Sequence, residues 1–315
     1  MGNRLEGKVA IVTGGGRGIG RGEALLLARE GAAVVVNDFG GSPAGEGGDM
    51  GPADEVVEEI RTAGGRAVAN YGSVADMATG EAAVKQALDE FGRLDILVNN
   101  AGILRDRMIF NMSEEEWDAV IAVHLKGHFT VTKPASILFR QQRSGRIVNT
   151  SSESGMGNMG QANYSAAKEG IAGLTRTIAR DLGRYGVTAN YIRPRAASRL
   201  TISPQMEEAR RRSQAAGMRS DVDEAIARME ALKPEYIAPL VVYLCTEEAA
   251  YVNGQDFLVG GAQISLVSQP AFDKTIWNPN GFWTLDELSK LFPQTIGQGM
   301  RNQWPAQAPK EAAAG

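Results

Sequence analysis

The strongest constraint in this sequence is the alternation of short apolar runs with helix-like segments. The runs are rich in β-branched residues and apolar nearly throughout, as expected when helices cover both faces of a parallel sheet. They are Val9–Thr13, Ala33–Asn37, Arg66–Asn70, Leu94–Asn99, Arg146–Thr150, Thr188–Ile192 and, after a helical stretch near Pro234–Leu244, Asp256–Val259. The pattern predicts an α/β fold: a single doubly wound, Rossmann-type domain with a seven-stranded parallel sheet and helices on both faces.

Three segments depart from this alternation. Phe39–Pro52 is glycine-rich and aperiodic, which predicts a surface loop after the second strand. Thr201–Leu232 is polar, helical in composition and rich in Arg and Glu, and it is inserted before the last run. Leu266–Gly315 is a tail in which Thr284–Leu291 is predicted to be helical. We therefore expect a Rossmann-type domain over residues 1–265, carrying the inserted segment, followed by the tail.

Composition and charge exclude several classes of protein. The chain has 315 residues, a formal net charge of -4 and no long block of one sign, which argues against a nucleic-acid partner. Its single cysteine, Cys245, excludes an internal disulfide and suits a reducing compartment. Met1–Lys8 is polar and runs directly into a strand, which does not resemble a signal peptide. No apolar run approaches the ~20 residues of a membrane span. We expect a cytoplasmic protein without a metal site.

A glycine-rich loop connects the first strand to the first helix. Glycines in such a loop allow a tight turn and a close approach of the backbone to a pyrophosphate, which then lies at a helix N-terminus. A glycine motif alone is weak, but its position between a strand and a helix at the start of an α/β chain makes it specific. The expected cofactor contacts in this loop are Gly14, Gly16, Arg17, Gly18, Ile19 and Gly20.

The choice of cofactor depends on two residues of opposite charge. Asp38 ends the second strand, eighteen positions after Gly20, where a carboxylate accepts hydrogen bonds from the adenosine ribose hydroxyls. The same carboxylate repels a 2′-phosphate, so NAD is expected and NADP is disfavoured. Arg17 argues in the other direction, because a guanidinium there could pair with a 2′-phosphate. We give more weight to Asp38.

The fifth strand leads to a set of residues suited to proton and hydride transfer. Ser152 follows this strand, Tyr164 lies twelve positions later, and Lys168 lies four positions after Tyr164, on the same face of a helix that begins near Ala162. A free tyrosine titrates near 10. An ammonium ~4 Å away contributes ~4 kcal/mol at an effective dielectric of ~20, enough to lower that pKa by up to ~3 units. Ser152 can then hold a substrate oxygen while Tyr164 exchanges its proton.

These motifs together resemble the short-chain dehydrogenase/reductase family over Leu5 to about Gly261. The resemblance rests on the glycine loop, Asn99–Gly102, Ser152 and the Tyr164-Ser-Ala-Ala-Lys168 segment. It implies hydride transfer between a secondary alcohol and a ketone, with the nicotinamide ribose held by Tyr164 and Lys168. It also implies homodimers or homotetramers. Further cofactor contacts implied by the family are Ser73, Val74, Asn100, Ala101, Gly102, Val123, Pro194, Ala197 and Ser198.

A narrower resemblance indicates the substrate. Val35–Gly41, Asn100–Arg107, Gly160–Lys168 and Leu232–Leu240 are similar to the dehydrogenase units of peroxisomal multifunctional enzymes type 2 and their bacterial homologues. This group acts as (3R)-hydroxyacyl-CoA and 17β-hydroxysteroid dehydrogenases. An acyl-CoA or steroid-like alcohol is therefore the expected substrate.

The chain departs from the family pattern at two places. His124 stands where the family has an asparagine that fixes a water in the proton relay; a relay role and a plain packing role both remain open. The family's Pro-Gly after the sixth strand is Pro194-Arg195, so the loop near the carboxamide lacks glycine's conformational freedom. Ser198 or a neighbour is then expected to hold the carboxamide.

The variable segments bear on substrate and assembly. Residues 201–232 lie where the family has its substrate lid. Arg210, Arg211, Arg212 and Arg219 could meet the phosphates of a CoA ester, but pairing with nearby acidic residues on a solvated helix is favoured. The aromatic residues of the tail are expected to cover this subunit or a neighbouring one; they are Trp277, Phe282, Trp283 and Phe292.

The sequence leaves one expected function and two alternatives. The first is NAD-dependent oxidation of a 3-hydroxyacyl-CoA or hydroxysteroid-type alcohol. The second is NADPH-dependent reduction of 3-oxoacyl groups in biosynthesis, against which Asp38 argues. The third is a non-catalytic nucleotide-binding protein, against which the combination of Ser152, Tyr164 and Lys168 argues.

Overall fold

The computed structural model describes residues 2–197, 227 and 230–304. The chain divides into two compact units, Met1–Ser268 and Gln269–Gly315. The first unit holds the whole sheet, and the second holds α10 (Leu285–Leu291) and the short 3-10 helix η5 (Phe292–Gln294). The boundary lies after the last strand, which itself extends beyond Leu266.

The first unit is built on one sheet whose strand order is β3-β2-β1-β4-β5-β6-β7-β8. The first seven strands are parallel, so the predicted doubly wound α/β class is confirmed. Their bounds are β1 (Val9–Thr13), β2 (Ala33–Asn37), β3 (Arg66–Asn70), β4 (Ile96–Asn99), β5 (Gly145–Thr150), β6 (Val187–Pro194) and β7 (Asp256–Gly260).

The predicted number of strands was wrong. An eighth strand, β8 (Gln263–Val267), pairs antiparallel with β7 at the edge of the sheet. The hairpin between them turns at Gly261, whose φ of +55° suits glycine. Most of β8 is exposed, and its apolar residues Ile264 and Leu266 are separated by the polar Ser265. The strand therefore lacks the continuous apolar run by which the buried parallel strands were recognised.

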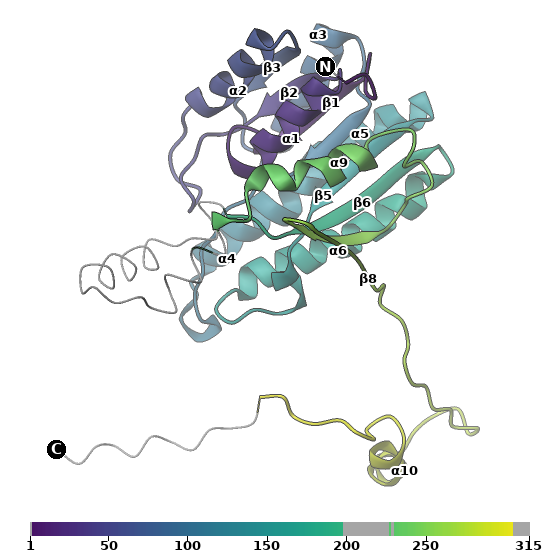
Figure 1. The fold of residues 1–315 in the computed structure, drawn as a ribbon. Coiled ribbons are helices and arrows are strands. Elements are labelled where there is room, and N and C mark those ends of the chain that lie inside the picture. The colour runs from purple at the N-terminus through teal and green to yellow at the C-terminus, as the bar shows by residue number, and fades with distance from the viewer. Residues whose placement is uncertain (1, 198–226, 228–229, 305–315) are drawn as a thin grey trace, which may run out of the picture. The chain divides into compact units, whose positions relative to one another are not determined.

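Helices cover both faces of the sheet, and each face has its own core (Figure 1). One core packs α1 (Gly18–Arg29), α2 (Gly51–Thr62) and α9 (Ala238–Leu244) against the sheet. The other core packs α3 (Met77–Phe91), α5 (Gly127–Gln142) and α6 (Ala162–Gly183). Successive residues of β1 alternate between the two cores, as the period of a strand requires.

The remaining elements are short and lie near the carboxyl ends of the strands. They are η1 (Ile109–Asn111), α4 (Glu114–Ile121), the π-helical turn η2 (Ala122–Lys126), η3 (Glu153–Met156) and η4 (Pro234–Tyr236). A capping box of Ser113 and Glu116 stabilises the start of α4. The loop predicted over Phe39–Pro52 ends earlier, because α2 begins at Gly51 with Pro52 in its first turn.

Membrane-spanning helices and clusters of metal-ligating side chains are both absent from the described residues. Within the parts of the chain that the structure describes, no helix is both long and apolar enough to cross a bilayer. Those same residues contain no group of three or more His, Cys, Asp or Glu side chains placed to hold a metal ion.

A carboxyl group is buried in the core beneath α1. The Glu23 side chain is fully buried, and neither of its oxygens has a hydrogen-bond partner among the described residues. Burial raises the pKa of this carboxyl from 4.5 to about 8. Glu23 is therefore mainly protonated at pH 7 in the folded chain.

This burial predicts a dependence of stability on pH. Between pH 4.5 and about 8 the Glu23 carboxyl ionises in the unfolded chain but keeps its proton in the folded chain. Its contribution to the free energy of unfolding therefore decreases as pH rises through that window. In Glu23→Gln this decrease should be absent. Denaturant unfolding of both chains at pH 5.5, 7 and 8.5 measures it; parallel curves for the two chains would contradict the burial argument.

Candidate active site

The candidate site begins where the strand order reverses. β1 and β4 are neighbours in the sheet, and the loops that follow them are bound to each other. Thr13 Oγ1 accepts hydrogen bonds from the backbone N–H groups of Asn100 (3.0 Å) and Ala101 (3.2 Å). In return, Asn100 Nδ2 donates to the carbonyls of Thr13 and Gly14, both at 3.1 Å. Ligands of doubly wound folds bind in the crevice at this point.

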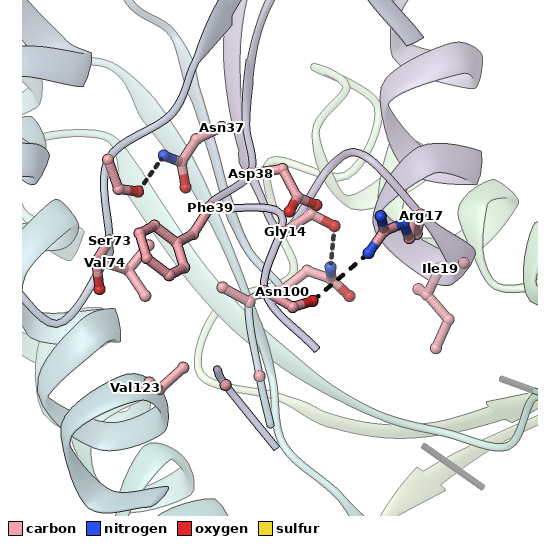
Figure 2. A pocket seen from close by; sticks show the side chains of 16 residues that line it. Gly14, Arg17, Ile19, Asn37, Asp38, Phe39, Ser73, Val74, Asn100 and Val123 are labelled. Carbon is pink, nitrogen blue, oxygen red and sulfur yellow. Dashed lines mark hydrogen bonds between the residues drawn. The ribbon is translucent and has the colours of Figure 1, made fainter. Parts of the chain in front are cut away.

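A cavity of about 330 Å³ lies in this crevice. Figure 2 shows Arg17 and Ile19 on one side, Phe39, Ser73 and Val74 on the other, and Asp38, Gly14 and Asn100 between them. The residues predicted to bind cofactor that line the cavity are Gly14, Arg17, Gly18, Ile19, Asp38, Ser73, Val74, Asn100, Ala101, Gly102 and Val123.

The glycine loop has the shape that a pyrophosphate requires. Gly14 has a φ of +63°, and a Cβ at this position would lie 2.8 Å from the Cα of Ala101. Gly18 opens α1 with a φ of +54° and nothing within 4 Å of a Cβ placed there. Backbone N–H groups at the start of α1 can therefore meet an anion in open space. The loop fits a dinucleotide cofactor.

Gly16 and Gly20 do not line the cavity. A Cβ on Gly20 would lie 2.3 Å from the carbonyl oxygen of Gly14, so this glycine permits the loop to pack on α1. Gly16 donates its backbone N–H to Asp38 Oδ2 at 2.9 Å and so holds the carboxylate. Both glycines therefore stabilise the loop and Asp38 without lining the cavity.

Asp38 is buried at the end of β2 and faces the cavity. Its second oxygen, Oδ1, accepts the backbone N–H of Gly40 at 2.7 Å. These two backbone bonds fix the carboxylate plane, and each oxygen keeps a lone pair for a further donor. The geometry suits a carboxylate that accepts ribose hydroxyls.

The opposing cation, Arg17, also lines the cavity. Its Nη1 donates to the carbonyl of Gly41 at 3.5 Å, and its Nη2 lies 3.9 Å from Asp49 Oδ2. Both partners belong to the loop between β2 and α2. The charge of Arg17 is thus partly balanced by Asp49, which the sequence interpretation did not consider.

Five lining residues were missed by sequence reasoning, namely Asn37, Phe39, Gly41, Gly45 and Gly72. Most of them flank residues that were predicted, so their positions beside Asp38 and Ser73 were the available signal. The loop after β2 also reaches across to the loop after β4, because Leu104 N–H donates to the carbonyl of Pro43 at 3.0 Å.

Ser152, Tyr164 and Lys168 meet at the carboxyl end of β5. Ser152 caps η3, and its Oγ accepts the N–H of Ser154 at 3.1 Å. Lys168 Nζ donates to the carbonyl of Thr150 at 2.6 Å and lies 5.4 Å from the centroid of the Tyr164 ring. The three predicted residues are therefore close together, although they do not line the cofactor cavity.

Burial sets the pKa values of this pair. It raises the pKa of Tyr164 to about 12, while a hydrogen bond with Ser152 acts in the opposite direction. It lowers the pKa of Lys168 to about 7. The expected decrease in the pKa of Tyr164 was wrong for this arrangement, because desolvation outweighs a lysine whose ammonium is turned to Thr150.

His124 lies against the edge of Tyr164. The two ring centroids are 5.1 Å apart and the rings are nearly perpendicular. Nε2 of His124 is 2.8 Å from the carbonyl oxygen of Ile103, to which it donates in one tautomer. Burial and the nearby charge of Lys168 lower the pKa of His124 well below its usual value, so the ring is neutral at pH 7. The structure thus places His124 in contact with Tyr164.

The loop after β6 is only partly described. Pro194 ends β6, and Ala197 donates its N–H to the carbonyl of Leu232 at 2.7 Å. Neither residue lines the cofactor cavity. Ser198, most of the expected lid at 201–232, and its four arginines lie outside the described residues.

Two segments with exposed apolar side chains flank the reacting residues. The backbone N–H of Arg107 donates to the carbonyl of Gly160 at 2.8 Å, and Arg107 forms an isolated β-bridge with Gln161, so these segments lie side by side. We call their exposed residues the apolar rim; they are Met108, Ile109, Phe110, Met156 and Met159. Sequence reasoning did not select them, because they lack periodicity.

Fold and site together define a nucleotide-dependent α/β oxidoreductase. A family model described as short chain dehydrogenase matches residues 8–209. The chain belongs to the short-chain dehydrogenase family, whose members use NAD or NADP to oxidise or form CH–OH groups.

Three relatives illustrate this membership. Hydroxyacyl-CoA dehydrogenase ChsB1 of Mycobacterium tuberculosis is 47% identical over 87% of this chain and 86% of its own length. Peroxisomal multifunctional enzyme type 2 of Mus musculus is 48% identical over 83% of this chain, which matches 32% of that longer protein. The crystal structure of a short chain dehydrogenase from Mycobacterium avium, 43% identical, superposes with a TM-score of 0.78 and covers 94% of this chain and 97% of its own.

Proposed function

We propose that this chain is an NAD-dependent dehydrogenase that oxidises a 3-hydroxyacyl-CoA. The observation that carries the proposal is the grouping of Ser152, Tyr164 and Lys168 at the same sheet edge as the cofactor cavity. The substrate class is supported by the similarity to the hydroxyacyl-CoA dehydrogenase of Mycobacterium tuberculosis, which extends over 86% of that relative's length. A hydroxysteroid-type alcohol is the alternative within the same activity.

Each reacting residue has a proposed role. When bound beside these residues, an oxidised nicotinamide would supply the hydride acceptor and a positive charge. Ser152 holds the substrate oxygen, and Tyr164 takes its proton. Lys168 holds the nicotinamide ribose together with Tyr164. Since its own pKa is about 7, Lys168 can pass a proton on at neutral pH.

We assign His124 to the same proton route. Its Nε2 is used by the backbone of Ile103, while its Nδ1 is buried with no partner among the described residues. A neutral imidazole held in this way can serve a water beside Lys168, as the asparagine of the family does. The edge contact with Tyr164 adds packing of the His124 ring against the phenol.

The preference for NAD rests on Asp38. Its buried carboxylate is fixed in the cavity by two backbone N–H groups, where a 2′-phosphate would meet a like charge. Arg17 is already near Asp49 and is the weaker determinant. The same geometry disfavours the biosynthetic alternative, a 3-oxoacyl reductase that depends on NADPH. The geometry of the cofactor cavity alone is also compatible with a non-catalytic nucleotide-binding protein. Measured turnover of NAD would exclude that function.

The apolar rim supports a substrate with a large apolar part. One of its exposed side chains, Met156, belongs to η3, which begins directly after Ser152, and Met159 follows η3 by three residues. An acyl chain or a steroid ring system lying on this rim would bring its oxygen towards Ser152 and Tyr164. A small polar alcohol would leave the rim uncovered.

We further propose a homodimer or homotetramer in the cytoplasm. In the tail unit, the Phe272 side chain is 99% exposed and the Trp277 side chain is 87% exposed. Such side chains favour association with a second apolar surface. A reducing compartment is supported by a single cysteine, Cys245, that is buried and unpaired.

The proposed activity predicts a specific pattern of turnover. Purified chain should reduce NAD in the presence of 3-hydroxyacyl-CoA esters and show lower kcat/KM for hydroxysteroids and for short alcohols. Tyr164→Phe should lower kcat by roughly a hundredfold or more while NAD affinity is nearly unchanged, because only the proton-transferring oxygen is lost. Retention of more than about a tenth of the activity would remove Tyr164 from the proposed role.

The cofactor assignment predicts a change of preference. Asp38→Ala should lower kcat/KM with NAD and shift the NAD to NADP ratio towards NADP by about tenfold, or ~1.4 kcal/mol, since a repulsive charge is removed. Asp38→Asn is the matched control for shape. Arg17→Ala should then weaken NADP alone in the Asp38→Ala background. An unchanged ratio in Asp38→Ala would show that this carboxylate does not contact the ribose.

The assembly proposal predicts that the tail unit determines size in solution. A chain ending at Ser268 keeps β8 intact and should elute as a smaller species, with an altered KM for the acyl-CoA. A chain ending at Trp304 keeps the described part of the tail unit and is the control. Light scattering during gel filtration measures both. The same oligomer and the same kinetic constants in all three chains would reject the proposal.

A further inference from the structure

Two arginines stand at the end of β6, and one of them is buried beside the reacting residues. Arg193 is 3% exposed. Its Nε donates to both oxygens of Asp256, at 3.1 and 2.9 Å, and its Nη2 donates to Glu169 Oε2 at 3.1 Å. Its Nη1 donates to the backbone carbonyl of Ser152 at 2.6 Å. All three nitrogens of a buried guanidinium are therefore used, as burial of a charge requires.

The Ser152 segment is held at three successive residues. Before it, Ser151 donates its N–H to Ile192 O (2.8 Å) and its hydroxyl to Lys168 O (2.8 Å). At Ser152 the carbonyl accepts from Arg193. After it, the Glu153 carboxylate accepts from Nε and Nη2 of Arg195 at 2.5 and 2.6 Å. Sheet pairing fixes only Ser151, and the Ser152 carbonyl also accepts the local N–H of Gly155 at 3.1 Å. The two arginines therefore supply the bonds that tie Ser152 and Glu153 to the end of β6.

Arg193 also connects the two halves of the reacting group. Glu169 directly follows Lys168 in α6, and Ser152 precedes η3, so one guanidinium bridges the helix of Tyr164 and Lys168 to the segment of Ser152. A displacement of about 1 Å between reacting groups can change a rate by about a hundredfold. A rigid, planar donor that fixes this spacing therefore has a direct effect on catalysis.

We propose that Arg193 is a positioning residue for the dehydrogenase reaction, which fixes the Ser152 peptide relative to α6 so that the serine hydroxyl meets the substrate oxygen. Arg195, through Glu153, is the second point of support. The proposal rests on the role of Ser152 in the proposed function. A purely structural role is the competing explanation, since the ion pair of Arg193 with Asp256 also ties β6 to β7.

The test separates these two roles with a double-mutant cycle. Removing Arg193 alone would leave Asp256 buried without its partner and could prevent folding. The cycle is therefore made in an Asp256→Asn background, in which Arg193 keeps its bonds to Ser152 and Glu169. Arg193→Met and Ser152→Ala are added singly and together. The assay uses whichever secondary alcohol the wild-type chain oxidises, so an incorrect substrate class does not affect it.

If Arg193 acts through Ser152, Arg193→Met should lower kcat at least about tenfold with serine present and less than about twofold with alanine present. NAD affinity, measured by fluorescence titration, should stay within about twofold. Equal losses of kcat in both backgrounds would overturn the proposal, because a structural role adds to the loss of the serine. Failure of the proposed function is distinguishable, since Ser152→Ala would then leave turnover unchanged before Arg193 is altered.

Arg195→Gln is a second test, which does not depend on the folding of the Arg193 variants. Arg195 is half-exposed, and its replacement removes the paired bonds to Glu153 without burying a lone charge. It should lower kcat about threefold with Ser152 present and have no effect with alanine there. The same loss in both chains would overturn the assignment of this segment.

Discussion

The reciprocal hydrogen bonds between Thr13 and Asn100 hold together the two loops on which the cofactor site depends. β1 and β4 are far apart in sequence, and the crossovers that follow them leave on opposite faces of the sheet. The crevice between these loops exists only because the strand order reverses there. The four bonds then set its width, since Asn100 binds the backbone of Gly14 at the start of the glycine loop.

The two ends of the site solve different physical problems. At the end proposed to bind adenosine, glycines make up much of the cavity lining, and Asp38 is itself fixed by backbone N–H groups. At the reacting end the important groups are side chains whose burial opposes their charge, so that the pKa of Tyr164 rises and that of Lys168 falls. Desolvation keeps Tyr164 neutral at pH 7 and leaves Lys168 only partly protonated there, and a cationic ring placed beside the phenol would favour its ionisation.

Much of this structure could be predicted from the sequence. β1, β2 and β3 were predicted to the residue. β1 and β2 are continuous apolar runs buried on both faces, whereas β3, at the edge of the sheet, is only partly buried. The grouping of Ser152, Tyr164 and Lys168 follows from helical spacing and from strand ends that share one edge. β8 was missed because an exposed edge strand has no such run. The direction of the pKa of Tyr164 was missed because burial cannot be read from spacing.

Arg193 shows a further limit of reading a sequence. An arginine in a largely apolar strand has no partner that the sequence alone identifies. In the fold, its guanidinium meets Asp256 from β7, Glu169 from α6 and the Ser152 carbonyl. The buried charge is tolerated because every nitrogen finds an oxygen, and this complete set of bonds also makes the segment rigid. Burial of the Arg193 charge has a cost in desolvation, and the bonds that offset this cost also hold the Ser152 segment in place. This segment carries the Ser152 hydroxyl, which is hydrogen-bonded to the phenol of Tyr164.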